Sequence, residues 1–282
     1  MRKLKITGGL NWNLNEPIDK RSLFRGIQYL CLSLALLSIA AENETSLPDL
    51  TQTDPKGNFA RGGKSYCGPV AISNSLMWLY REELNRSGAS QYDLVNQLAS
   101  EKYMNTDPVK GTGPNGVMRG VKQFLKDRGL SDTDYSMQFQ GWRSHRSEFS
   151  SGVKEPQLKW IRETLASGGA VWFNLGWYRK DEENDSYERI GGHWVTAIEA
   201  GRTPEGQPDP EIVVIHDPAP RAGQEATRQY VKMISLENGE LIGKTRHLPR
   251  PATGLFQMAG EMCIKSSADC AILDGAVALR FK

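Results

Sequence analysis

The sequence predicts an α+β protein in which the helices come first and the strands come later. Between residues 67 and 166, apolar residues recur at steps of three and four, which is typical of helices that bury one face. After Gly168-Gly169 the pattern changes to short apolar runs rich in β-branched and aromatic residues, which is typical of strands. We therefore expect a helical half followed by a mostly antiparallel β-sheet half.

Four helices are expected in the first half. The first begins at Cys67-Gly68-Pro69, because proline is tolerated in the first helical turn, where its missing N–H needs no partner. The second follows a serine cap at Ser90, the third covers residues 117–128 and ends at Gly129, and the fourth covers residues 156–166. The expected core residues are Ile72, Leu76 and Leu79 in the first helix, Leu94, Val95 and Leu98 in the second, and Val117, Val121, Phe124 and Leu125 in the third.

The second half contains five expected strands, which make up the sheet. They cover residues 170–175, 193–200, 211–216, 229–234 and 276–281. The charged run at residues 179–185 is expected to be a solvated loop between the first two strands. A cleft is expected where the helical half meets the sheet half.

The charge balance excludes nucleic acid as a natural partner. The chain of 282 residues has a formal net charge of +2, but residues 1–41 hold six of its 35 basic side chains and only two of its 33 acidic ones. The remaining 29 basic and 31 acidic side chains leave a slight negative charge. A nucleic-acid-binding domain needs a basic surface, and this composition does not provide one.

Residues 1–41 are expected to be an export signal. A basic stretch ends at Arg25, an apolar stretch of about 12 to 15 residues follows, and Ser38 and Ala40 form a small-x-small cleavage site. This stretch is shorter than the roughly 20 residues that span a bilayer, so we expect cleavage near Ala40 and a periplasmic or extracellular protein. The alternatives are an uncleaved membrane anchor and a buried N-terminal helix.

Three cysteines remain after cleavage. Cys263 and Cys270 lie seven residues apart and either close a small disulfide loop in an oxidising compartment or stay as two free thiols. Cys67 is then the one without a partner. The chain has no Cys-x-x-Cys motif and its histidines are scattered, so we expect neither a metal nor a cofactor.

Cys67 has the features of a nucleophile. It lies at the start of a helix, where roughly half a unit of positive charge favours the thiolate. Far downstream, His193 begins an apolar segment, and Asp217 follows a strand that Pro218 brings to an end. A nucleophile, a general base and a group that orients the base are the parts of nucleophilic catalysis. The alternative is that Cys67 is a small buried apolar residue.

These motifs resemble the papain-like cysteine peptidases. The resemblance rests on Tyr66-Cys67-Gly68-Pro69, Gly192-His193-Trp194-Val195 and Asp217-Pro218, in that order. Within that family the chain is most similar to the double-glycine peptidases that process bacteriocin leaders, a branch in which a segment like Gly111-Thr112-Gly113-Pro114-Asn115-Gly116 also precedes a helix.

The resemblance runs from about Gln52 to Pro218, and residues 237–282 lie outside it as a C-terminal extension of a domain expected at 42–282. It implies a papain-like α+β fold in a bacterial protein. Cys67 would be the nucleophile, His193 the base and later the acid, and Asp217 the group that fixes the imidazole tautomer.

One position departs from the family pattern. The family carries a glutamine six residues before the cysteine, where its amide helps to form the oxyanion hole, but this chain has Arg61 there. Gln52 and Asn58 are the nearest upstream amides that could replace it. An oxyanion donor lowers the activation barrier by roughly 3 kcal/mol, and the backbone N–H of Cys67 offers one such donor.

Two neighbours of the expected triad have different expected roles. Trp194 is the one aromatic residue that we expect at the cleft, where it would shield the imidazole of His193 from water. His216 is expected to be structural, because adjacent residues of a strand point to opposite faces.

The sequence therefore predicts an exported cysteine peptidase that acts on a peptide or protein substrate. The alternatives are a cell-wall amidase or transamidase with the same triad, and a papain-like binding module that has lost catalysis.

Overall fold

Six antiparallel strands close into a barrel in the computed structural model, which describes residues 47–220, 228–243 and 249–282. The ring runs β9–β8–β5–β4–β3–β2 and returns to β9, because β2 pairs with β3 on one edge and with β9 on the other. The barrel strands are β2 (Ala170–Asp181), β3 (Ser186–Arg202), β4 (Pro208–His216), β5 (Gln229–Ser235), β8 (Phe256–Gly260) and β9 (Cys270–Phe281).

Three more strands extend this sheet. β1 (Tyr135–Gly141) pairs with the second half of β9, while β6 (Glu240–Ile242) pairs parallel with β3 and antiparallel with β7 (Arg250–Pro251). Strands β6 to β9 all come from the segment after residue 236, so this C-terminal part of the chain completes the barrel.

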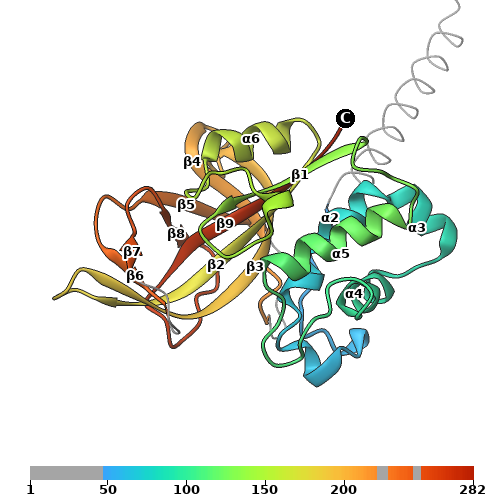
Figure 1. Cartoon of the computed structure of the whole chain (residues 1–282), viewed down its shortest axis with the longest axis horizontal. Helices are drawn as coiled ribbons and strands as arrows, with labels where there is room; N and C mark the ends of the chain where they lie inside the picture. Colours follow the sequence, from blue (N-terminus) through green and yellow to red (C-terminus); the bar gives the residue numbers. More distant parts are fainter. Residues whose placement is uncertain (1–46, 221–227, 244–248) are drawn as a thin grey trace, which may run out of the picture. The chain divides into compact units, whose positions relative to one another are not determined.

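Five α-helices are present among the described residues. They are α2 (Cys67–Leu79), α3 (Arg81–Ser87), α4 (Gln91–Ala99), α5 (Pro114–Lys126) and α6 (Leu158–Ala166), with short 3-10 turns at Pro55–Gly57, Ala60–Gly63 and Ser147–Phe149. Figure 1 shows α2 to α5 gathered on one side of the strands, while α6 lies apart from them against the barrel. We call α2, α4 and α5 the helical layer.

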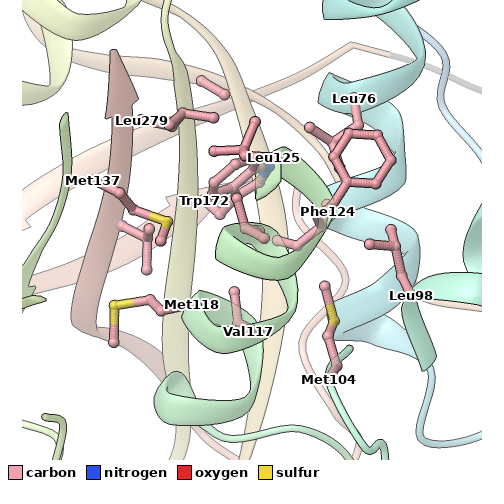
Figure 2. Packing of buried hydrophobic residues seen from close by; sticks show 14 of the residues in the cluster. Leu76, Leu98, Met104, Val117, Met118, Phe124, Leu125, Met137, Trp172 and Leu279 are labelled. Atoms are coloured by element: carbon pink, nitrogen blue, oxygen red, sulfur yellow. The ribbon is translucent and has the colours of Figure 1, made fainter. Parts of the chain in front are cut away.

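The helical layer packs on the outer face of β1, β2 and β9. Figure 2 shows this core, in which Phe124 and Leu125 of α5 and Leu76 of α2 surround Trp172 of β2. A buried hydrogen bond crosses this core: the indole N–H of Trp172 donates to Ser75 Oγ of α2 at 3.1 Å. Since burying an unpaired polar group is costly, this contact favours one placement of α2 on the sheet.

The barrel has its own interior. Alternate residues of all six strands point inward, as the two-residue period of a strand requires, and Ile161 of α6 joins them. The inward residues of β2 and β9 are Val171, Phe173, Leu175 and Trp177 of β2 and Ala271, Leu273, Ala276 and Ala278 of β9. The two largest hydrophobic clusters of the described residues therefore share strands β2, β3 and β9.

The expected α+β, papain-like fold, with a helical half followed by a sheet half, is wrong. The protein is mostly β, and its sheet closes on itself instead of lying open against helices. The order of elements is also mixed, because β1 comes before α6 in the chain. The helical pattern of residues 67–166 conceals β1, whose pairing partner β9 lies about 140 residues further along.

The individual elements were predicted better than their arrangement. Helices α2, α4, α5 and α6 and strands β2, β3, β4, β5 and β9 lie at the expected places, whereas α3, β1, β6, β7 and β8 were not expected. The charged run at 179–185 is only partly a loop, since Arg179, Lys180 and Asp181 continue β2 in register with β3.

One expectation concerns the N-terminal end of the chain. The export signal at 1–41 lies outside the described residues. Within the part that is described, no helix combines the length and the apolar character needed to cross a bilayer.

Candidate functional site

Cys67 is the first residue of α2, as the sequence predicts. The helix starts there because Gly68 and Pro69 form its first turn, and the thiol is half-buried at that end. A Cβ at Gly68 would meet Thr112 Cβ at 3.2 Å and Trp194 Cδ1 at 3.6 Å, so a larger residue would press against the loop before α5. The small residue lets the start of the helix approach β3.

His193 and Asp217 come from neighbouring strands of the barrel. β3 pairs with β4 so that Thr196 lies opposite His216, and Asp217 is the first residue after β4. Continuing this register places Asp217 opposite Val195, on the same face of the sheet as His193. The pairing of β3 with β4 thus brings the base and the carboxylate together.

The two side chains form a short hydrogen bond. His193 Nε2 lies 2.6 Å from Asp217 Oδ1, and the backbone N–H of Ala219 donates to the same oxygen at 2.8 Å. With Nε2 held by the carboxylate, the other ring nitrogen, Nδ1, is available to the thiol of Cys67, which lies within hydrogen-bonding reach of the imidazole. The three predicted triad residues therefore meet at one place.

The electrostatics of this place favour a charged imidazole. Burial lowers the pKa of His193, but the charge and hydrogen bond of Asp217 outweigh it, and together with Cys67 they raise that pKa to about 10. His193 is thus predominantly protonated at neutral pH when it faces Asp217, and a positive group lies beside the Cys67 sulfur.

A tryptophan stacks on the imidazole, but it is not the expected one. The ring of Trp177 lies 5.5 Å from the ring of His193 at an interplanar angle of 25°. Trp194 also lines the site, yet its indole N–H donates to Thr112 O at 2.8 Å and its side chain packs in the core of the helical layer. The pairing of Trp177 with Gly191 places it diagonally across from His193, which the sequence alone did not reveal.

Of the two side-chain amides expected at the oxyanion hole, Gln52 lies at the site and Asn58 does not. Gln52 lines the site, but its Nε2 donates to the carbonyl oxygens of Gly63 and Lys64, each at 3.0 Å, so both N–H bonds are in use. Asn58 and Arg61 are exposed, and neither is among the residues that line the site. The backbone N–H of Cys67, at the start of α2, is the oxyanion donor that the fold provides.

The triad opens into a cavity of about 600 Å³. Its walls come from the start of α2, the loop before α5, strands β2 and β3, and the segment after Asp217. A space of this size holds several residues of an extended peptide or a small ligand.

Several lining residues were not singled out by the sequence. They are Arg143, Asn174, Trp177 and Arg189, and Arg189 is ion-paired with the fully buried Asp274. A carboxylate inside the apolar run of β9 is the signal that could have revealed this pair, because a charge buried in a strand needs a partner.

The remaining polar candidates have structural positions. His216 Nδ1 lies 3.0 Å from the carbonyl oxygen of Pro48, on the opposite side of the strand from Asp217, as expected for a structural residue. Cys263 and Cys270 are both free thiols, and Cys263 is exposed at the edge of the cavity while Cys270 is buried. Over the described ranges, no group of three or more histidine, cysteine and acidic side chains is placed to hold a metal ion.

Comparisons with protein-family models and with curated proteins find no match to this chain. The geometry of the site is therefore the basis for its function.

Proposed function

We propose that the protein is a thiol-dependent hydrolase of peptide or related amide bonds, with Cys67, His193 and Asp217 as its catalytic residues. One observation carries the proposal: a half-buried thiol at the start of a helix lies beside an imidazole that a buried carboxylate holds at 2.6 Å, all in one cavity. A nucleophile, a base and an orienting group within reach of one another are the requirements of acyl transfer.

The reaction has two steps. In the first, the Cys67 thiolate attacks the carbonyl carbon, the C–N bond breaks, and protonated His193 gives its proton to the departing amine. In the second, water attacks the thioester while His193 takes up a proton from it, and the carboxylic acid leaves as the Cys67 sulfur is released. Asp217 keeps the imidazole oriented through both steps and stabilises its charged form.

The predicted side-chain oxyanion donors are not available in the fold, and this favours a second candidate function. The amide N–H groups of Gln52 are bound to backbone carbonyls and Asn58 lies outside the cavity lining, so of the predicted donors the backbone N–H of Cys67 is in place. A missing donor costs roughly 3 kcal/mol of barrier, or about a hundredfold in rate. A binding module that retains the triad without useful turnover is the alternative.

The test is alkylation of Cys67 by iodoacetamide at pH 6 in a Cys31→Ser, Cys263→Ser background, because Cys263 is exposed at the same cavity and Cys31 lies outside the described residues. We expect fast labelling that Cys67→Ala abolishes and that His193→Ala slows at least tenfold, since the imidazolium no longer stabilises the thiolate. Labelling at the rate of a free cysteine, or labelling that persists in Cys67→Ala, would contradict the proposal.

Turnover separates the candidate functions. The same preparation is incubated with casein and with purified peptidoglycan, and new amino termini are measured. Release from casein identifies a peptidase and release from peptidoglycan a cell-wall amidase. Fast Cys67 labelling without release from either substrate identifies the binding module.

A further inference from the structure

The cavity wall next to His193 holds two arginines around one buried carboxylate. Asp274 of β9 is fully buried, and its Oδ2 accepts from Arg189 Nε at 2.7 Å. Its other oxygen, Oδ1, accepts from the hydroxyl of Tyr178 at 2.6 Å and from the indole N–H of Trp142 at 3.1 Å. Asp274 is thus committed to one arginine and two neutral donors.

Arg143 is the second arginine, and its charge is not balanced in the same way. Its Nε is buried without a hydrogen-bond partner, and its guanidinium carbon lies 5.0 Å from the ring centroid of Trp142. Burial and the nearby charge of Arg189 lower the pKa of Arg143, against a smaller opposing effect of Asp274. Two guanidinium groups therefore share one carboxylate, which leaves an excess positive charge at this wall.

Glycines make room for Arg189 at the cavity. A Cβ at Gly192, the residue before His193, would lie 2.6 Å from Arg189 Nη2. A Cβ at Gly176 would lie 2.8 Å from Asp274 Oδ2 and 3.0 Å from Arg189 Nε. The guanidinium of Arg189 therefore lies against the backbone of β2 and β3, in a place that side chains at these two glycines would fill.

The other cationic side chains of the cavity lining add to this positive charge. Lys64, Lys110 and Lys265 also line the cavity, and among its described lining residues there is no aspartate or glutamate. Asn174 adds an acceptor: it is 5% exposed, it lines the cavity, and its Oδ1 is buried without a hydrogen-bond partner. A buried acceptor of this kind gains free energy when a ligand N–H binds to it.

We propose that the cavity selects acidic peptides, with Arg143 and Arg189 binding a carboxylate of the peptide inside the cavity and Asn174 Oδ1 accepting a peptide N–H. This proposal rests on the proposed function only in naming the bound molecule a substrate. The planar guanidinium forms paired hydrogen bonds with a carboxylate, and a carboxylate here would also neutralise the excess charge. A neutral peptide would leave the excess charge without a counter-ion.

The experiment measures binding without turnover, in the full chain with Cys67→Ala. The probes are N-acetylated, C-amidated tetraglutamate and tetraglutamine, which differ in charge but hardly in size, titrated calorimetrically at pH 7. We expect tetraglutamate to bind at least tenfold more tightly, and Arg143→Gln to remove most of that difference. Arg146→Gln is the matched control, because Arg146 is exposed and outside the cavity lining.

Equal affinities for the two peptides, no binding of tetraglutamate, or an undiminished preference in Arg143→Gln would overturn the proposal. Arg143→Met is the second neutral variant, used if the glutamine variant unfolds at a lower urea concentration than its parent. Because the binding test uses a chain without the nucleophile, it can succeed where Cys67 labelling fails. The two proposals therefore fail separately.

Discussion

The helical layer and the barrel contribute to the site in different ways. The layer provides Cys67, whose place follows from local features, since it is the first residue of α2 and is followed by Gly68 and Pro69 in the first turn. The barrel provides His193 and Asp217, which meet only because β3 and β4 pair in one particular register. A one-residue slip of that register would turn one of the two side chains to the other face. The nucleophile is therefore placed by short-range structure and the base by long-range structure.

Buried polar contacts hold the two regions together. Thr196 of β3 donates to the carbonyl oxygen of Ala71 in α2 at 2.6 Å, and Asn74 Nδ2 lies 3.5 Å from the same hydroxyl. Thr196 is three residues from His193 and Ala71 is four residues from Cys67. These contacts therefore fix the distance between base and nucleophile.

The largest expected effect comes from removing the charge that the barrel holds behind His193. Asp217→Asn should lower kcat by about 10³-fold or more, because the amide no longer stabilises the protonated imidazole or its tautomer. The measurement is turnover of whichever substrate the casein and peptidoglycan assay identifies. Asp209→Asn, in the strand β4 that precedes Asp217 but outside the cavity lining, should leave kcat unchanged. Equal kcat for Asp217→Asn and the parent would remove Asp217 from the triad.

The same pair predicts how stability depends on pH. The folded-state pKa of His193 is raised to about 10, mainly by Asp217 against the effect of burial, whereas the unfolded value is about 6.5. A raised pKa stabilises the fold fully below about pH 6.5, and this stabilisation decreases as the pH rises toward 10. Urea midpoints of the parent should therefore fall between pH 6.5 and 9. In Asp217→Asn the fall should be much smaller, and an equal fall would show that other groups cause it.

The difference between the two regions also explains what the sequence could predict of the fold. The expected faces of α2, α4 and α5 are buried because a helix pattern is local, and Ser90 caps α4 as its position indicates. Closure of the barrel depends on β9 pairing with β2 along one edge and with β8 along the other. Alternation of apolar residues predicts that a segment is a strand, but it does not say which strands are its neighbours.

The residues of the site also divide into those that the local sequence could identify and those that only the strand pairing reveals. Cys67 and Asp217 could be selected because each stands next to a glycine or proline at the end of an element. His193 could be selected because it follows Gly191-Gly192, although these glycines lie inside β3. Trp177 and Arg189 could not, because a bulge in the β2–β3 pairing follows Trp177, and the partner of Arg189 lies 85 residues away on β9. The choice of Trp194 over Trp177 shows that adjacency in sequence is a weaker guide than the register between strands.

A smaller effect is expected at the contact between the two regions. Thr196→Val keeps the shape of the side chain but leaves the carbonyl oxygen of Ala71 without its donor, which should lower the free energy of unfolding by about 1–3 kcal/mol. If the contact sets the distance from Cys67 to His193, kcat should fall while KM changes little. Thr196→Ser retains the hydroxyl and should restore kcat. A loss of stability with unchanged kcat would mean that the site tolerates movement between layer and barrel.

The smallest effect is expected inside the helical layer, away from the contact with the barrel. Ser90 Oγ accepts from the backbone N–H of Asp93 at 3.2 Å, and the Asp93 carboxylate accepts from the backbone N–H of Ser90 at 3.0 Å, so the two residues form a capping box. Ser90→Ala removes the side-chain half of this box and should lower the free energy of unfolding by about 1 kcal/mol, as measured by urea denaturation. The rate of Cys67 alkylation should stay the same, because α2 is fixed by its own start and by Thr196. A slower alkylation rate would instead show that loosening the start of α4 changes the position of Cys67. Short-range structure alone would then not place the nucleophile.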